Sequence, residues 1–239
     1  MSRKRSSADR LIVALDAPTA SQALVMARRL RGLVPTVKVG SVLFTAAGPS
    51  VVARLRALRF HVMLDLKFFD IPNTVEQSVR AAVRHRVSML TVHASGTGEM
   101  LRAAVLGARA EARRLGVPRP LVLGVTVLTS TADGGRSRMT AEVLRLARAA
   151  RLAGCDGVVA SVHEAAVLRR RLGRRMKIVC PGIRPRGGSL GDQRRVATPG
   201  AAVQAGADFL VVGRPITASR NARRAVHTLY EAVEAVNGC

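Results

Sequence analysis

Aromatic residues are scarce in this sequence of 239 residues, which has no tryptophan, one tyrosine and five phenylalanines. Proteins that bind single-stranded nucleic acids without sequence preference commonly stack the bases on aromatic side chains. The scarcity of rings therefore argues against base stacking as the way this protein acts.

Cysteine is also rare. The three cysteines, Cys155, Cys180 and Cys239, are odd in number and lack the spacing of a metal-ligand motif. A disulfide framework uses an even number of cysteines, and structural zinc sites place theirs in close pairs. We therefore predict reduced thiols, a cytoplasmic location and no metal.

Long hydrophobic runs are missing as well. The apolar run 11–15 ends at Asp16 and is too short for the core of a signal peptide. No run reaches the roughly 18 apolar residues that a membrane-spanning helix needs. We expect no membrane partner, a basic flexible tail over residues 1–9, and a single catalytic domain over residues 10–239.

Acidic residues are few, since 15 Asp and Glu stand against 39 Lys and Arg, for a formal net charge of +24. The arginines are spread over most of the predicted helices and form no single basic block. This spread predicts a broadly basic surface and no specific nucleic-acid partner. A small anionic substrate would still be attracted by the positive field.

What the sequence does contain is a regular alternation of short apolar runs with longer amphipathic segments. Strands are predicted over 11–15, 36–39, 60–65, 87–92, 121–126, 157–160, 177–180 and 209–212. Helices are predicted over 19–31, 49–58, 73–85, 97–115, 139–153, 162–173, 199–205 and 219–236. Eight strand–helix units in a chain of this length indicate an α/β fold, a single-domain (β/α)8 TIM barrel.

The third predicted strand ends in an unusual group of charges. Asp65 and Lys67 are two residues apart and share one face of a strand, and Asp70 follows just beyond it. Burying these charges is costly unless they are paired and used. Asn73 can cap the next helix, with Glu76 three residues later, as in a capping box. We interpret this strand end as the edge of an active site.

Other polar residues also follow predicted strands. Asp16 closes the first strand, Lys38 interrupts the second, and Thr129 and Ser130 follow the fifth. In a (β/α)8 barrel, the chemistry is carried by the carboxyl ends of the strands. A stabilising ion network remains the alternative explanation for the charges.

A second constellation follows the last two strands. Pro181 and Arg184 follow the seventh strand, Gln193 lies in a glycine-rich loop, and Gly213 and Arg214 follow the eighth strand. The loops after strands seven and eight commonly bind phosphate in this fold. Arginines can fork onto phosphate oxygens, and a glycine lets the backbone approach closely. These residues predict a phosphate site.

Taken together, these segments resemble the orotidine 5'-monophosphate decarboxylase family, in its bacterial form. The matching segments are 15–16, 37–40, 65–74, 91–94, 181–184, 191–195 and 212–215. They match in order and spacing over about residues 10 to 235, and the run 65–74 is the most specific. The spread of basic residues is the main departure, and it does not touch the motifs.

The resemblance implies decarboxylation of orotidine 5'-monophosphate to uridine 5'-monophosphate in de novo pyrimidine biosynthesis, without metal or cofactor. Lys67 would donate a proton to carbon 6 of the pyrimidine, and Asp65 would lie beside the substrate carboxylate. Lys38 and Asp16 would hold ribose hydroxyls. Lys38 would also tie the charge network together.

The remaining roles are likewise implied by the resemblance. In a homodimer, Asp70 would reach into the partner's site, with Ile71 and Thr74 alongside it. Two further groups complete the site: Thr129 and Ser130 over the base, and Pro181, Arg184, Gln193, Gly213 and Arg214 around the phosphate. The segment 181–195 would close over the substrate.

Two other interpretations stay open at this point. The first is another barrel with an Asp-x-Lys-x-x-Asp strand, such as the magnesium-dependent decarboxylases and aldolases that act on ketose phosphates. The second is a basic scaffold or nucleic-acid-binding protein, for which the charges at the strand ends would have no explanation.

Overall fold

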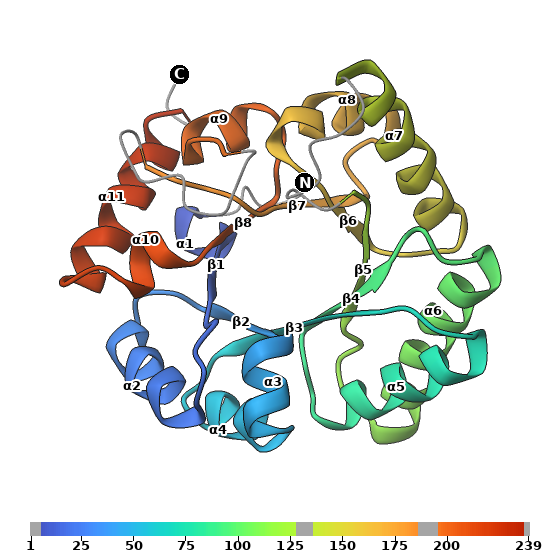
Figure 1. Ribbon diagram of the computed structural model, residues 1–239, viewed down its shortest axis with the longest axis horizontal. Coiled ribbons are helices and arrows are strands. Elements are labelled where there is room, and N and C mark those ends of the chain that lie inside the picture. Colours follow the sequence, from blue (N-terminus) through green and yellow to red (C-terminus); the bar gives the residue numbers. More distant parts are fainter. Residues whose placement is uncertain (1–5, 128–135, 186–195, 237–239) are drawn as a thin grey trace.

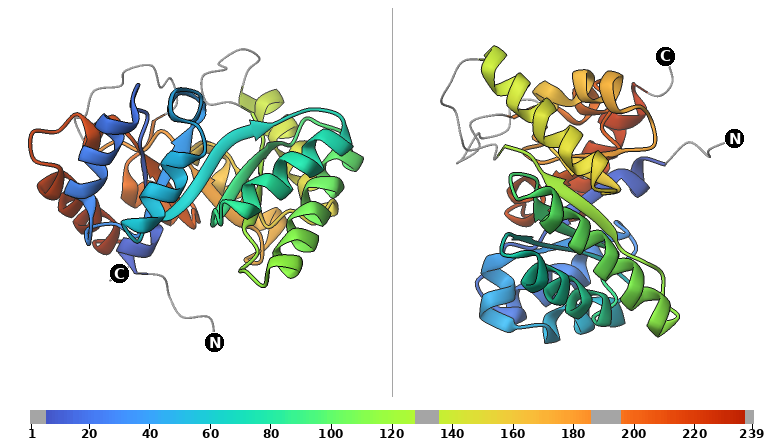
Figure 2. Two further views of the ribbon diagram at one scale, coloured as in Figure 1. Left: turned by 90° about the horizontal axis from the view of Figure 1, so that it is seen from below. Right: turned by 90° about the vertical axis from the view of Figure 1, so that its right-hand side faces the viewer.

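The computed structural model describes residues 6–127, 136–185 and 196–236. Its eight strands pair in sequence order, each parallel to the next, and β8 pairs with β1 to close a barrel. Helices surround the strands in the view of Figure 1 and in both side views of Figure 2. The predicted single-domain (β/α)8 barrel is therefore confirmed.

All eight predicted strands are present, within a few residues of their expected bounds. They are β1 (Leu11–Ala14), β2 (Thr36–Gly40), β3 (His61–Phe68), β4 (Met89–His93), β5 (Leu121–Val125), β6 (Gly157–Val159), β7 (Lys177–Cys180) and β8 (Phe209–Val212). The largest difference is in β3, which continues to Phe68, whereas the apolar pattern predicted an end at residue 65. The extension was not predicted because Asp65 and Lys67 interrupt the apolar pattern there.

The eight predicted helices are also present. They are α2 (Ala20–Leu30), α4 (Ser50–Ala57), α5 (Pro72–Arg84), α6 (Gly98–Leu115), α7 (Arg136–Leu152), α8 (Val162–Leu172), α9 (Pro199–Gln204) and α11 (Ala222–Glu234). Several begin at a Ser, Thr or Asn side chain that accepts a main-chain N–H, as Thr97 does from Met100. Such caps each stabilise a helix by about 1 kcal/mol.

Three short helices were not predicted. They are α1 (Ser7–Arg10), α3 (Ser41–Ala47) and α10 (Arg214–Thr217). Helices of four to seven residues contain too few turns to produce a clear helical periodicity. Helix α1 overlaps the expected tail, and Ser7 Oγ donates a hydrogen bond to Glu234 Oε1 of α11 at 2.7 Å. Residues 1–5 of that tail lie outside the described residues.

The predicted cap of α5 is wrong. The helix begins at Pro72, and its N-cap is Ile71, which has no side chain that can accept a hydrogen bond. Proline suits the first helical position because its fixed φ is already helical and it has no N–H to satisfy. Glu76 instead pairs with Arg80 at 2.7 Å.

Two apolar layers hold the barrel together. Side chains such as Ile12, Met63, Leu123 and Val179 fill the interior, and a larger cluster lies between the strands and the helices. Burying a side chain of this size stabilises the fold by about 1.5–3 kcal/mol. This packing makes the strand ends a rigid frame for any site built on them.

Helices α5 and α6 pack closely beside β3 and β4. Gly107 of α6 faces Glu76 of α5, where a Cβ would lie 2.8 Å from Glu76 Cγ. The buried carboxylate of Glu111 is held by Arg84 and Arg114 at 2.7 Å each. Hydrogen bonds from Arg114 and Arg84 lower the pKa of Glu111 to about 2. This cluster anchors the helix that follows the charged end of β3.

Within the residues that the structure describes, none of the helices combines the length and apolarity that crossing a membrane requires.

Candidate active site

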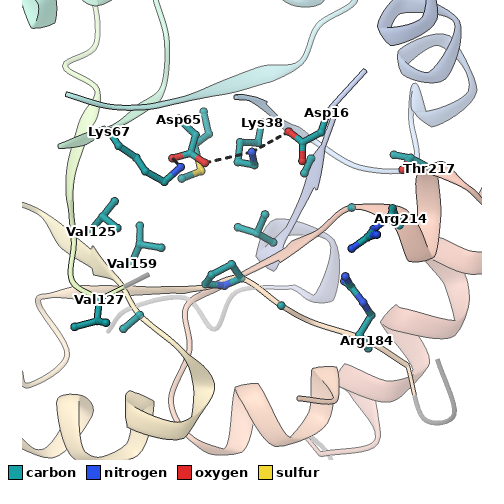
Figure 3. Close-up of a pocket in the computed structure, with 17 residues that line it drawn as sticks. Asp16, Lys38, Asp65, Lys67, Val125, Val127, Val159, Arg184, Arg214 and Thr217 are labelled. Carbon is teal, nitrogen blue, oxygen red and sulfur yellow. Dashed lines mark hydrogen bonds and ion pairs between the residues drawn. The ribbon is translucent and has the colours of Figure 1, made fainter. Parts of the chain in front are cut away.

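A cavity of about 560 Å³ opens at the carboxyl ends of the barrel strands. Figure 3 shows a row of charged side chains along one side, made by Asp16, Lys38, Asp65 and Lys67. Valines lie near Lys67, while arginines lie at the opposite end. One end of the cavity therefore combines the Lys67 ammonium with an apolar wall, and the other end holds Arg184 and Arg214. The remaining charged side chains lie between these two ends.

The charged row is a continuous chain of ion pairs with alternating sign. Lys38 Nζ lies 3.2 Å from Asp16 Oδ1 and 3.2 Å from Asp65 Oδ2. Lys67 Nζ lies 3.1 Å from Asp65 Oδ1. Each carboxylate oxygen of Asp65 therefore serves a different lysine, which fixes the plane of the carboxylate.

Burial and charge act in opposite directions on this row. Burial opposes the charge on Lys38, but the carboxylates of Asp65 and Asp16 outweigh it and raise its pKa. Burial also opposes the charge on Asp65, yet Lys38, Lys67 and a hydrogen bond from Thr91 lower its pKa overall. Lys38 and Asp65 are therefore both ionised at neutral pH.

The side chain of Lys67, at one end of the row, is more accessible than those of the two central members, Lys38 and Asp65. It is 33% exposed, against 11% for Lys38 and 12% for Asp65. An ion network that only stabilises the fold has no need of an ammonium facing an open cavity. The exposure of Lys67 thus favours a role in binding or catalysis over the stabilising network.

Strand β3 is irregular where it carries these charges. Its pairing with β4 joins Leu64 to Leu90 and then Phe68 to Val92, so the register shifts between the two pairs. Lys67 has a φ of +51°, in the left-handed region that non-glycine residues rarely adopt. Asp65 and Lys67 both line the cavity, as predicted. The regular strand alternation on which we based that prediction does not hold here.

Thr91 of β4 supports this irregular segment. Its hydroxyl accepts a hydrogen bond from the main-chain N–H of Lys67 at 2.9 Å and donates one to Asp65 Oδ1 at 2.9 Å. Thr91 is fully buried. Thr91 was not predicted as a site residue, because a threonine within an apolar strand is an ordinary β-forming residue.

Gly40, at the end of β2, leaves room for the ion pairs. A Cβ at this position would lie 3.1 Å from both Asp16 Oδ1 and Lys38 Nζ. Those distances are too short for comfortable contact, so a larger residue would displace the pair. The glycine two residues after Lys38 is thus a signal of the site that can be recognised in the sequence.

The wall beside Lys67 is apolar. Val125 and Val127 at the end of β5 and Val159 at the end of β6 line the cavity there. None of the three was predicted as a site residue, because valine at a strand end carries no chemical signal. Apolar neighbours keep water away and strengthen the field of the Lys67 ammonium.

The opposite end of the cavity is formed by the segments after β7 and β8. Arg184 is buried, and the exposed Arg214 faces it across the cavity, with Thr217 nearby. Burial and the positive charge of Arg214 lower the pKa of Arg184. A bound anion between the two guanidinium groups would relieve their repulsion. Pro181 and Gly213 also line this end, as predicted.

Main-chain contacts hold the start of the segment after β7. Ile183 forms a parallel bridge with Ala197, and the N–H of Arg184 donates to the carbonyl of Ala197 at 2.9 Å. Gly182 has a φ of +75°, which glycine adopts without strain. These features aim Arg184 into the cavity.

Other predicted site residues do not line the cavity of their own chain. Asp70, Ile71 and Thr74 are exposed and do not line it. Asp70 Oδ1 accepts a hydrogen bond from the N–H of Ile71 at 2.7 Å. Thr129, Ser130 and Gln193 were also predicted, and they lie outside the described residues.

His93 lies at the end of β4 near the charged row. Its ring meets that of Phe69 edge to face, with centroids 5.7 Å apart. Burial and the charge of Lys67 lower the pKa of His93. Across the described residues, no group of three or more His, Cys, Asp or Glu side chains is arranged to hold a metal ion.

Comparison with known proteins finds relatives along nearly the whole chain. A family model described as "Orotidine 5'-phosphate decarboxylase / HUMPS family" matches residues 9–229. A curated orotidine 5'-phosphate decarboxylase of Nitratidesulfovibrio vulgaris (strain DP4) is 47% identical over 231 residues, covering 95% of this chain and 98% of the relative. One from Halorhodospira halophila is 50% identical over 218 residues, covering 89% and 90%.

A solved structure agrees with these relatives. The crystal structure of orotidine 5'-phosphate decarboxylase from Lactobacillus acidophilus matches with a TM-score of 0.81 and 35% identity, covering 94% of this chain and 99% of that chain. The similarity thus extends over the barrel and both ends of the cavity.

Proposed function

Because the chain belongs to the orotidine 5'-phosphate decarboxylase / HUMPS family, we propose that it decarboxylates orotidine 5'-monophosphate to uridine 5'-monophosphate in pyrimidine biosynthesis. One observation carries this choice. Lys67, paired with Asp65 at 3.1 Å, borders a cavity whose opposite end holds Arg184 and Arg214. The relatives from Nitratidesulfovibrio vulgaris, Alcanivorax borkumensis and Halorhodospira halophila, which are 45–50% identical, are each named as this decarboxylase.

The three parts of the nucleotide match three parts of the cavity. The phosphate binds between Arg184 and Arg214, where two cations face each other. The ribose lies along Asp16 and Lys38, whose oxygen and nitrogen atoms bind its hydroxyls. The pyrimidine lies against the valine wall, with its carbon 6 beside Lys67.

The chemical step breaks the bond between carbon 6 and the carboxylate and releases carbon dioxide. The electron pair of that bond stays on carbon 6, in an orbital that the ring cannot delocalise. The ammonium of Lys67 stabilises the developing negative charge and then transfers one proton to carbon 6. A preorganised donor of this kind is worth about 3–4 kcal/mol in the transition state. Solvent then reprotonates the Lys67 amine.

Asp65 holds the Lys67 side chain in place. Its carboxylate pairs with Lys67 Nζ at 3.1 Å, which fixes the amine beside the reacting carbon. In this arrangement Asp65 lies beside the substrate carboxylate, so its repulsion of that carboxylate adds a secondary driving force. The main contribution comes from the fixed cation.

We further propose that the reaction needs neither metal nor cofactor. Purified protein treated with EDTA is expected to remove the absorbance of the orotate ring at the same rate as untreated protein. Activity that EDTA abolishes and Mg²⁺ restores would instead support the magnesium-dependent barrels acting on ketose phosphates. Salt-sensitive DNA binding without decarboxylation would support the basic scaffold.

We also propose a cytoplasmic homodimer in which Asp70 completes the partner's site, with Ile71 and Thr74 beside it. Phe69 and Ile71 are 60% and 65% exposed, which is high for large apolar side chains. They flank Asp70, so an apolar contact between two copies at this loop would carry Asp70 to the interface.

Replacing Arg214 with alanine tests the phosphate site. Because the phosphate contact supplies binding energy remote from the reacting carbon, kcat/KM for orotidine 5'-monophosphate is expected to fall by about 100-fold. The same variant is expected to lose little activity on the nucleoside orotidine, which has no phosphate. Steady-state rates with both substrates measure the difference.

The matched control is Arg220→Ala, at an exposed arginine that does not line the cavity. It removes one positive charge from the same part of the protein and is expected to leave both substrates unaffected. Equal losses on nucleotide and nucleoside in Arg214→Ala would contradict a phosphate-binding role.

A further inference from the structure

We propose that Thr91 is a positioning residue that holds the main chain of Lys67 and the carboxylate of Asp65 in their working arrangement. The proposal rests on the proposed decarboxylase function. Thr91 lies in the middle of β4 and is fully buried, and it does not line the cavity. It therefore acts on the reaction only through its two hydrogen-bond partners.

The two hydrogen bonds of Thr91 close a ring of contacts. Its Oγ1 accepts from the N–H of Lys67 and donates to Asp65 Oδ1, each at 2.9 Å. The same Oδ1 atom pairs with Lys67 Nζ at 3.1 Å. One hydroxyl thus links both ends of Lys67, its main chain directly and its ammonium through Asp65.

The direction of each bond is dictated by chemistry. A main-chain N–H can only donate, and an ionised carboxylate can only accept. The atom between them must therefore accept one hydrogen bond and donate another. A hydroxyl does both with a single proton and its lone pairs. Valine has the shape of threonine but can do neither.

The backbone conformation around Lys67 explains why the two hydrogen bonds of Thr91 are needed. The pairing of β3 with β4 shifts register between Leu64 and Phe68, and Lys67 has a φ of +51°. Such a conformation costs about 1–3 kcal/mol and persists only where surrounding contacts impose it. The N–H of Lys67 donates to the Thr91 side chain within this irregular segment. The Thr91 hydroxyl is thus a contact that sustains the shifted segment and directs the lysine into the cavity.

The charges around Asp65 make the effect measurable. Lys38 of β2, Lys67 of β3 and His93 of β4 face Asp65, and Asp16 faces it through Lys38. The hydrogen bond from Thr91 is one of the contacts that lower the pKa of Asp65. Without it, that pKa rises, and the loss of activity at acid pH begins at a higher pH.

The test compares Thr91→Val with Thr91→Ser and with Thr36→Val. Thr36 is the control, because it is a buried threonine at the start of β2 and does not line the cavity. Rates of decarboxylation, affinity for uridine 5'-monophosphate and the pH profile of kcat are measured for each variant. Thermal unfolding reports how far each variant is destabilised.

We expect kcat of Thr91→Val to fall by about 100-fold, the scale of an ångström-sized misplacement of reacting groups. KM and the affinity for uridine 5'-monophosphate should change little, because the arginines and ribose contacts remain. In the pH profile of kcat, the fall on the acid side should begin at a higher pH. Thr91→Ser should keep a near wild-type kcat and an unshifted pH profile, and Thr36→Val should keep wild-type kinetics.

Several results would overturn the proposal. These are a Thr91→Val enzyme with wild-type kcat, a Thr91→Ser enzyme as impaired as Thr91→Val, or a loss confined to KM. If Thr91→Val does not fold, Thr91→Cys replaces it, since a thiol is a weak donor and acceptor. The expected order of kcat is then serine above cysteine, and equal values would refute the role of the hydroxyl.

The same experiment separates this proposal from the function on which it rests. An active wild-type enzyme with an unimpaired Thr91→Val variant overturns only the role of Thr91. A wild-type protein that does not decarboxylate orotidine 5'-monophosphate overturns the proposed function, and the role of Thr91 with it.

Discussion

Replacing Lys67 with alanine is expected to lower kcat for orotidine 5'-monophosphate by at least about 10⁴-fold. The variant loses a fixed cation beside the developing carbanion, which is worth about 10²–10³-fold. It also loses the group that protonates carbon 6, which is worth a further 10²–10⁴-fold or so. The loss of orotate-ring absorbance at saturating substrate measures the effect.

The protein should remain folded, because Asp65 keeps Lys38 as a partner at 3.2 Å when Lys67 is removed. Binding of uridine 5'-monophosphate should persist through the arginines and the ribose contacts. Lys177→Ala is the control, since Lys177 begins β7 at the end of the barrel away from the cavity. Turnover within tenfold of wild type in Lys67→Ala would remove Lys67 from the chemistry.

Mixing two inactive variants, Lys67→Ala and Asp70→Ala, is expected to restore about a quarter of the wild-type activity. In a two-fold dimer, random exchange makes about half of the dimers mixed. Each mixed dimer then holds one intact site, with Lys67 from one chain and Asp70 from the other. Its second site lacks both groups. Activity therefore rises from nearly zero by several orders of magnitude.

The measurement needs proof that subunits have exchanged. Differently tagged variants can be unfolded together, refolded and purified through both tags, and the mixed dimer assayed alone. It should then show about half of the wild-type activity per dimer. A pure mixed dimer with no activity would show that each site is built within one chain. The exposed position of Asp70, outside its own cavity, motivates the experiment.

Much of the fold could be predicted from the sequence because its causes are local. Apolar runs of four or five residues mark the strands, and amphipathic segments mark most of the helices. The shortest helices and the extension of β3 to Phe68 were not predicted. Proline at residue 72 displaced the predicted Asn73 cap, because it favours the first turn of a helix.

The candidate site was predictable to the extent that charges stand out at strand ends. Asp16, Lys38, Asp65 and Lys67 do form one row along the cavity, and Arg184 and Arg214 lie at its other end. The roles of Asp70, Ile71 and Thr74 across a dimer stay predictions. Thr129, Ser130 and Gln193 stay predictions as well, outside the described residues.

By itself, the sequence determined the order of strands and helices and which strand ends carry charge, because periodicity and residue type act over a few neighbouring positions. Only the tertiary structure decided how those charges meet. Thr91 bonds to Lys67 24 residues away, and Lys38 bonds to Asp16 22 residues away. Contacts of that separation depend on how neighbouring strands pair. The register shift of β3, and with it the aim of Lys67, therefore appears only once the barrel is closed.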